Sequence, residues 1–253
     1  MELDMAVLSK QGGRPSNEDA CGYRTSERRC CWVVSDGAGG HGSGDVASKT
    51  VVKSILRDFA GPIPVSAEGI RALLARANSA VLRQQDRHSR LSAMRATVAV
   101  LEIDLQQRGA LWGHLGDTRV YSFRNGRILS QTRDHSVIQT MVDAGYSDGV
   151  ALREHPRRNV LLYALGSDDD LLPSVCEEML PIDNGDVFLL CTDGLWEYVT
   201  EEAMERELAA SSSARRWLEA LERELLAHAG EGHDNYSAIA VWVGNSGDAT
   251  RIV

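Results

Sequence analysis

The segment between Thr97 and Gln131 carries four apolar runs of β-type composition with very little chain between them. The runs cover residues 97–103, 110–115, 118–123 and 127–131. A parallel crossover needs about a dozen residues or more, usually including a helix, so these gaps admit only short turns. Asn125-Gly126, between the last two runs, is typical of a tight hairpin. The segment therefore predicts an antiparallel sheet.

The rest of the chain predicts helices in blocks. Further strand-like runs lie at 3–8, 30–34, 186–191 and 237–243, and helical periodicity is found at 45–59, 67–87, 136–144, 201–209 and 214–229. Because the helices come before and after the four-strand segment, the order favours α+β layers over a doubly wound parallel sheet. Thr200 is placed to cap the helix at 201–209. No repeat or long linker divides the chain, so residues 1–253 are expected to form one domain.

Composition restricts the partners of this chain. Asp and Glu number 36 against 27 Lys and Arg, a formal net charge of -9, so general affinity for nucleic acid or an anionic membrane is not expected. No apolar run approaches the roughly 20 residues of a membrane-spanning helix, and the first ten residues are acidic where a secretion signal would be basic. These features predict a cytoplasmic protein. Five cysteines without C-x-x-C spacing argue against a disulfide framework and against a zinc site.

A glycine-rich stretch, VSDGAGGHGSGD at 34–45, follows the strand-like run at 30–34 and leads into a predicted helix. Its GAGGHG fits the dinucleotide pattern G-x-G-x-x-G, but no second strand follows the helix with an acid for the ribose. Asp36 would also put a carboxylate where that fold binds phosphate. A P-loop is excluded because the stretch continues as Gly44-Asp45 rather than Gly-Lys-Ser/Thr. The nucleotide interpretation is therefore disfavoured.

Metal binding is the stronger interpretation of the same stretch. Two apolar runs end alike, in Asp36-Gly37 and in Asp193-Gly194, and Asp234 precedes a third strand. A single Asp-Gly after a strand is usually only a turn. Several carboxylates brought together would repel one another and raise each other's pKa unless cations offset the charge. Oxygen ligands of this kind suit Mg²⁺ or Mn²⁺ better than zinc.

A further acidic cluster, Glu18-Asp19, follows Arg14 by four residues. The guanidinium of Arg14 offers a planar fork that suits phosphate, and it could bind an anion that the acidic chain as a whole would repel. An exposed loop with no function explains this stretch better when it is considered alone.

Six short motifs occur in order along the chain. They are R-x-x-N-E-D at 14–19, D-G-x-G-G-H at 36–41, G-D-T-R at 116–119, R-D-H-S at 133–136, T-D-G-L at 192–195 and H-D-N at 233–235. With these motifs the chain resembles the metal-dependent type 2C (PPM) protein serine/threonine phosphatases, in particular the stand-alone bacterial members. The resemblance extends from about residue 12 to residue 243.

The resemblance implies a four-layer αββα sandwich, in which two central antiparallel β-sheets are flanked by helices. It also implies a centre of two Mg²⁺ or Mn²⁺ ions. Transferred by motif, Asp36 would bridge both ions and Gly37 would give its backbone carbonyl to one of them. Asp193 and Asp234 would hold the other ion.

The remaining motif residues receive supporting roles from the same resemblance. Glu18 and Asp19 would act mainly through metal-bound waters, and Asp117 with Asp193 would hold a third, weaker ion. Arg14 would clamp the phosphate of the substrate while a metal-activated water attacks phosphorus, so no cysteine nucleophile is needed.

The general acid is the least defined role. His41 is the candidate, although a histidine there could equally orient a ligand or a water. Eukaryotic relatives place a histidine directly after Asp-Gly, where this chain has Ala38. Residues 145–159 align with the variable flap of the family, and the arginines of this segment could meet an acidic or phosphorylated substrate. A plain surface loop explains the segment about as well.

Three functions remain as hypotheses. The first is a monomeric protein phosphatase that acts on phosphoserine and phosphothreonine and opposes a Ser/Thr kinase, with type VI secretion control as one setting. The second is a pseudophosphatase that only binds phosphoproteins. The third is a metal-dependent hydrolase of small phosphate esters. The presence of Asp36, Asp193 and Asp234 favours the first, because a pseudoenzyme is expected to have lost one of them.

Overall fold

Two antiparallel sheets form the centre of the molecule in the computed structural model, which describes residues 1–39, 43–85, 90–147, 151–168 and 171–244. Sheet I has the strand order β1-β13-β12-β8-β9, and sheet II has the order β10-β7-β6-β3-β2 with β11 also paired to β7. Sheet I consists of β1 (Leu3–Lys10), β13 (Tyr236–Val243), β12 (Val187–Cys191), β8 (Arg119–Arg124) and β9 (Arg127–Gln131). Sheet II consists of β10 (Ser174–Val175), β7 (Gly109–Leu115), β6 (Val98–Asp104), β3 (Arg29–Ser35), β2 (Ala20–Thr25) and β11 (Leu180–Pro181).

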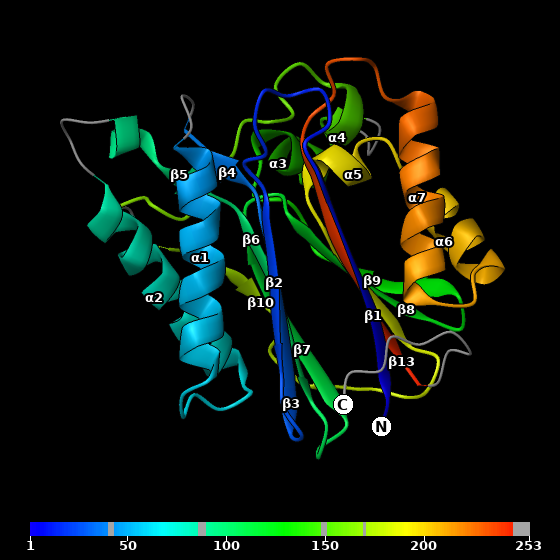
Figure 1. Ribbon diagram of the computed structural model, residues 1–253. Coiled ribbons are helices and arrows are strands. Elements are labelled where there is room, and N and C mark those ends of the chain that lie inside the picture. Colours follow the sequence, from blue (N-terminus) through cyan, green and yellow to red (C-terminus); the bar gives the residue numbers. More distant parts are fainter. Residues whose placement is uncertain (40–42, 86–89, 148–150, 169–170, 245–253) are drawn as a thin grey trace.

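Helices cover the outer face of each sheet (Figure 1). Helices α1 (Gly44–Phe59) and α2 (Ala67–Gln84) pack on sheet II, and α6 (Glu201–Ala210) and α7 (Ala214–His228) lie on the side of sheet I. The predicted αββα sandwich is confirmed. The predicted cap at Thr200 is also confirmed, since its hydroxyl accepts a hydrogen bond from the backbone N–H of Ala203 at 3.2 Å.

Strand β3 shows why the sandwich has three apolar layers. Its side chains alternate, so that Cys31 and Val33 pack toward α1 and α2 while Trp32 and Val34 pack between the two sheets. A third cluster, which includes Trp217 of α7, lies between sheet I and its helices. Both faces of the central strands are therefore buried.

The four-strand segment differs from its prediction in one respect. Its strands are antiparallel as expected, but β6 and β7 belong to sheet II while β8 and β9 belong to sheet I. The chain changes sheets at 116–118. Gly116 makes this corner, because it has φ +95° and a Cβ there would lie 2.6 Å from the side chain of Thr97. The prediction of a single continuous sheet was wrong, because strand spacing alone does not reveal which sheet a strand joins.

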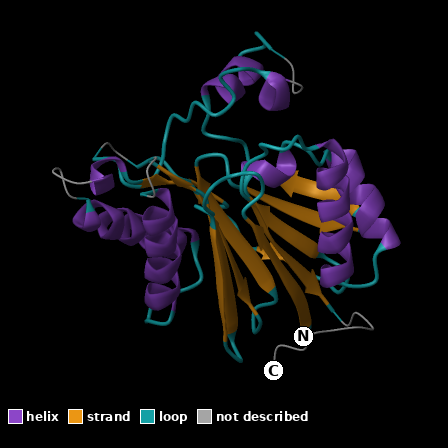
Figure 2. Ribbon diagram, turned by 45° about the horizontal axis from the view of Figure 1, so that its top comes forward, coloured by secondary structure: helices purple, strands orange, loops and turns teal. Residues whose placement is uncertain are grey.

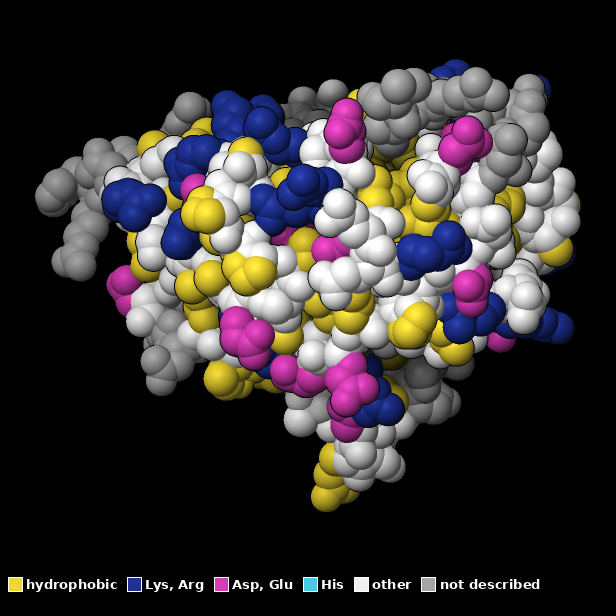
Figure 3. Space-filling view, turned by 90° about the horizontal axis from the view of Figure 1, so that it is seen from below, with side chains coloured by type: hydrophobic (Ala, Val, Ile, Leu, Met, Phe, Trp, Pro, Cys, Tyr) yellow, Lys and Arg dark blue, Asp and Glu magenta, His cyan; other side chains and the backbone are white. Residues whose placement is uncertain are grey.

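Short elements complete the fold at the end of the sandwich where β3 and β12 finish. They are β4 (Gly37–Ala38), β5 (Arg95–Ala96), the 3₁₀ turn Arg90–Ala93, α3 (Val137–Asp143), α4 (Ala151–Glu154) and α5 (Asp193–Trp196). Figure 2 shows α3 and α4 standing away from the layered body. Within the described residues no helix is long and apolar enough to cross a membrane. The opposite end of the molecule carries interspersed acidic, basic and hydrophobic side chains (Figure 3).

Candidate metal centre

A pocket of about 530 Å³ opens at the end of the sandwich where β3 and β12 finish. The predicted residues that line it are Arg14, Glu18, Asp36, Gly37, Asp117, Asp193 and Asp234. Asp19 is buried and is joined to this lining through Thr192, the neighbour of Asp193. The hydroxyl of Thr192 donates a hydrogen bond to Oδ2 of Asp19 at 3.0 Å. His41 lies outside the described residues.

Asp36 directly follows β3, and Thr97 holds its backbone. The N–H of Thr97 donates to the carbonyl of Asp36 at 2.8 Å, and the N–H of Asp36 donates to the hydroxyl of Thr97 at 3.3 Å. Gly37 comes next, where a Cβ would lie 1.9 Å from the carbonyl oxygen of Gly44 and 2.8 Å from that of Glu18. Only glycine lets these three backbone segments approach so closely.

Asp234 and Asn235 join the other end of the chain to the loop at 14–19. Arg14 forms an ion pair with Asp234 at 2.7 Å across the mouth of the pocket. The side chain of Asn235 accepts a hydrogen bond from the N–H of Glu18 and donates to the carbonyls of Gln11 and Ser16. Asn235 therefore organises the loop that carries Arg14 and Glu18.

The electrostatics of the pocket are unfavourable for bare carboxylates. Burial, with the neighbouring acids adding to it, raises the pKa values of Asp36 and Asp193 well above their usual range. Burial also raises the pKa of Asp117 to about 7 and that of Asp19 to about 6. The Oδ1 atom of Asp19 is buried and has no hydrogen-bond partner among the residues that the structure describes. Divalent cations would offset this concentration of negative charge.

The donor set fits hard ions. Carboxylates and the carbonyl of Gly37 offer only oxygen atoms, which Mg²⁺ and Mn²⁺ prefer. No group of three or more Asp, Glu, His or Cys side chains in the described part of the chain forms a ready-made cage around one ion. A centre whose ions keep several water ligands does not require such a cage. The five cysteines are free thiols outside the pocket lining, and Cys30, Cys31 and Cys191 are buried.

Comparison with known proteins agrees with this geometry. A sequence model described as "Protein phosphatase 2C" matches residues 10–229. This chain belongs to the protein phosphatase 2C family. Among curated members of the family, it is 30% identical over 211 residues to the serine/threonine protein phosphatase PstP of Mycobacterium tuberculosis, a match that covers 82% of this chain and 39% of the relative. The chain thus spans about two fifths of the length of that protein.

A Listeria welshimeri member of the protein phosphatase 2C family, the serine/threonine phosphatase stp, is 28% identical over 234 residues that cover 90% of each chain. A crystal structure of the catalytic domain of a serine/threonine protein phosphatase PstP in complex with two manganese ions superposes with a TM-score of 0.80, 26% identity, and coverage of 96% and 99%. A third relative, PppA, described as a key regulatory component of type VI secretion in Pseudomonas aeruginosa, superposes with a TM-score of 0.75, 28% identity, and coverage of 96% and 99%.

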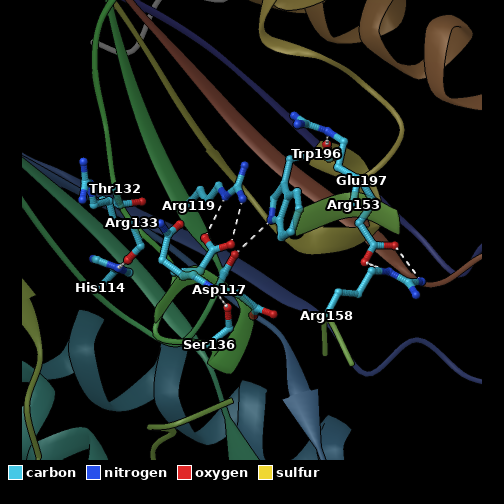
Figure 4. Close-up of polar contacts among 12 residues, drawn as sticks. His114, Asp117, Arg119, Thr132, Arg133, Ser136, Arg153, Arg158, Trp196 and Glu197 are labelled. Carbon is cyan, nitrogen blue, oxygen red and sulfur yellow. Dashed lines mark hydrogen bonds and ion pairs between the residues drawn. The ribbon is translucent and has the colours of Figure 1, made fainter. Parts of the chain in front are cut away.

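Two arginines of the segment expected to align with the protein phosphatase 2C flap tie it to the body of the molecule. Arg153 bonds Glu201 at 2.7 Å and the carbonyl of Trp196 at 3.1 Å, and Arg158 bonds both carboxylate oxygens of Glu197 (Figure 4). These two arginines are engaged within the chain, which corrects the expectation that the arginines of this segment meet the substrate. Arg157 remains exposed. These partners could not be predicted from local sequence patterns, because they lie about 40 residues or more from the two arginines along the chain.

Several residues that organise the centre had no individual role predicted from the motifs. They are Thr97, Thr192, Trp196 and Asn235. Thr192 and Asn235 lie inside the motifs T-D-G-L and H-D-N, and Trp196 directly follows T-D-G-L. Their position in or beside a motif was the sequence feature that could have identified them as residues of the centre.

Proposed function

We propose that this chain is a protein serine/threonine phosphatase that hydrolyses phosphoserine and phosphothreonine in proteins with the help of two Mg²⁺ or Mn²⁺ ions. The single observation that carries the proposal is the convergence of acids from distant segments in one pocket, with Arg14 at its mouth. Membership of the protein phosphatase 2C family and the two manganese ions of a related structure support it.

Each acid has a proposed task. Asp36 would hold both ions, Gly37 would offer its backbone carbonyl to one of them, and Asp193 and Asp234 would hold the other. Divalent ions lower the pKa of a bound water and offset charge on phosphoryl oxygens. Glu18 and Asp19 would act mainly through metal-bound waters, and Asp117 with Asp193 would hold a third, weaker ion.

The substrate side of the pocket has two proposed participants. Arg14 exchanges its partner Asp234 for the phosphoryl group, because a guanidinium binds two phosphate oxygens in the same planar way. His41 is the proposed general acid for the serine or threonine oxygen. We propose a Ser/Thr kinase as the opposing enzyme and a monomeric, single-domain protein acting in the cytoplasm. The likeness to PppA supports type VI secretion control as one setting.

The decisive experiment compares hydrolysis of a phosphothreonine peptide with hydrolysis of p-nitrophenyl phosphate, each with Mn²⁺ and with excess chelator. We expect peptide turnover that requires Mn²⁺ and falls by at least about 100-fold in Asp36→Asn, since that change removes the bridging carboxylate. Asp104→Asn, at the far end of β6, is the matched control and is expected to keep full activity. Full peptide turnover by Asp36→Asn would contradict the proposal, and turnover of the small ester alone would favour the third hypothesis.

A further inference from the structure

Each residue of the corner at 116–118, which carries Asp117, is hydrogen-bonded to a different partner. The N–H of Gly116 donates to Nδ1 of His135 at 3.2 Å, and the carbonyl of Gly116 accepts the N–H of His135 at 2.9 Å. The hydroxyl of Thr118 bonds the hydroxyl of Thr97, the residue that also holds Asp36. The backbone on both sides of Asp117 is therefore fixed, and its carboxylate lines the pocket.

Trp196 holds Asp117 itself. The indole N–H of Trp196 donates to the backbone carbonyl of Asp117 at 2.9 Å, and the tryptophan is only 2% exposed (Figure 4). Trp196 is the last residue of α5, and Asp193 is the first. One helical turn thus joins the residue that holds Asp117 to the acid that would share an ion with it.

Arg119 keeps the indole in place. Its guanidinium carbon lies 3.5 Å from the centre of the Trp196 ring, close enough for a cation–π contact. Two hydrogen bonds of 2.7 Å tie the same guanidinium to both oxygens of Asp134, and the side chains of this pair are each 2% exposed. A buried bidentate ion pair has little conformational freedom, so the Trp196 ring that packs against it is held at a defined distance and orientation.

These contacts connect three of the motifs. Asp117 and Arg119 come from G-D-T-R, Asp134 from R-D-H-S, and Trp196 follows T-D-G-L. The hydrogen bond from the indole is a direct link between the corner at 116–118 and helix α5, and it spans the gap between two elements that each contribute an acid to the pocket.

We propose that Trp196 is a positioning residue, whose indole N–H sets the placement of Asp117 relative to Asp193 and so determines how tightly the weakest ion of the centre binds. The inference rests on the proposed function, because it assumes the metal centre. It assigns Trp196 no contact with the substrate. Outer partners of ligands commonly change metal affinity by about 10–100-fold when they are removed.

The test is Trp196→Phe, which keeps a ring against Arg119 but removes the N–H. Trp217→Phe is the matched control, because Trp217 is equally buried and its indole N–H also donates to a backbone carbonyl, that of Met204, at 3.1 Å. Bound Mn²⁺ is counted by electron paramagnetic resonance during titration of each metal-free protein. We expect the weaker binding phase to lose at least about tenfold in affinity in Trp196→Phe and the tighter phases to persist. All phases should persist in Trp217→Phe.

The outcomes separate this inference from the proposed function. A parent protein that binds no Mn²⁺ would contradict the proposed function. A parent that binds Mn²⁺ normally, with an unchanged weaker phase in Trp196→Phe, would overturn only the role of Trp196. An equal loss in Trp217→Phe would overturn it too, since the effect would then follow from general loosening of the core.

A second measurement uses the parent protein, so it holds even if Trp196→Phe fails to fold. In ¹⁵N-labelled protein, the indole N–H signal of Trp196 is followed during titration with Mg²⁺. We expect that signal to shift in the weaker binding phase, while the signal of Trp217 stays unchanged. A Trp196 signal that shifts only in the tighter phase, or does not shift, would overturn the proposal.

Discussion

Glu102 is an acid buried outside the pocket. It lies in β6 between Cys31 of β3 and Leu111 of β7, it is 1% exposed, and its Oε2 atom has no hydrogen-bond partner among the described residues. Burial raises the pKa of Glu102 to about 7. The folded protein therefore holds a proton here that the unfolded chain releases near pH 4.5.

The pH dependence of stability follows from this difference in proton binding. Stabilisation by neutral Glu102 is fully present below about pH 4.5 and is lost as pH rises through about 7, with a total of up to about 3 kcal/mol. Glu102→Gln should lack this loss, so the free energy of unfolding in urea should fall less between pH 5 and pH 8 than in the parent. Glu27→Gln, at an exposed position in the turn between β2 and β3, is the control. Parallel pH profiles for Glu102→Gln and the parent would contradict the prediction.

Arg14 is the second residue with a specific prediction. Arg14→Ala removes the proposed clamp at the pocket mouth, and hydrogen bonds to charged groups contribute about 1.5–3 kcal/mol, so KM for a phosphopeptide should rise about tenfold or more. The fall in kcat should be smaller, because the metal ligands remain. Steady-state kinetics measure both constants, with Arg24→Ala on β2 as the control. An unchanged KM would remove Arg14 from substrate binding.

Among the elements, α4 is held by side-chain hydrogen bonds to α5 and α6. Helix α4 has four residues, too short to be stable alone, and Arg153 fastens it to Glu201 and to the carbonyl of Trp196. The orientation of this segment beside the pocket therefore depends on contacts with α5 and α6 rather than on its own helical propensity.

Arg153→Met should release α4 from these contacts while keeping most of the apolar stem. The lost hydrogen bonds to a charged group predict that amide hydrogen exchange across 151–159 becomes about tenfold faster. Arg157→Met, in the same segment and exposed, provides the matched control. Equal protection in Arg153→Met and the parent, followed by mass spectrometry, would show that the two bonds do not hold the segment.

At the scale of the molecule, the pocket joins the two halves of the sandwich. Asp36 follows a strand of sheet II, Asp193 follows a strand of sheet I, and Asp234 precedes the neighbouring strand of sheet I. Ions held between these acids would link the two sheets. Metal binding should therefore stabilise the whole fold rather than one loop.

Thermal unfolding tests this coupling. A ligand at 100 times its dissociation constant stabilises the native state by about 2.7 kcal/mol, so saturating Mn²⁺ should raise Tm by about 5–10 °C above the value in chelator. Asp36→Asn should lose most of that rise because the ligand between the two ions is missing. A Tm independent of Mn²⁺ would argue against ions bound at the junction of the sheets.

Local patterns were sufficient for much of this fold. The apolar runs at 97–131 correspond to β6, β7, β8 and β9, and the hairpin at Asn125-Gly126 has the positive φ values, 54° and 74°, that such a turn needs. Strand β2 was missed, because its sequence ACGYRT does not alternate and its side chains are only partly buried. The predicted helix at 67–87 ends three residues earlier, at Gln84.

The sequence by itself determined most of the long strands and helices and the acids at the strand ends, since these depend on neighbours within a few residues. Only the tertiary structure decided that the chain changes sheets at Gly116, that Asn235 organises the loop of Arg14, and that Arg153 and Arg158 are bound within the molecule. These features depend on contacts between segments about 20 to 220 residues apart, which come together only when both sheets bury their apolar faces against each other.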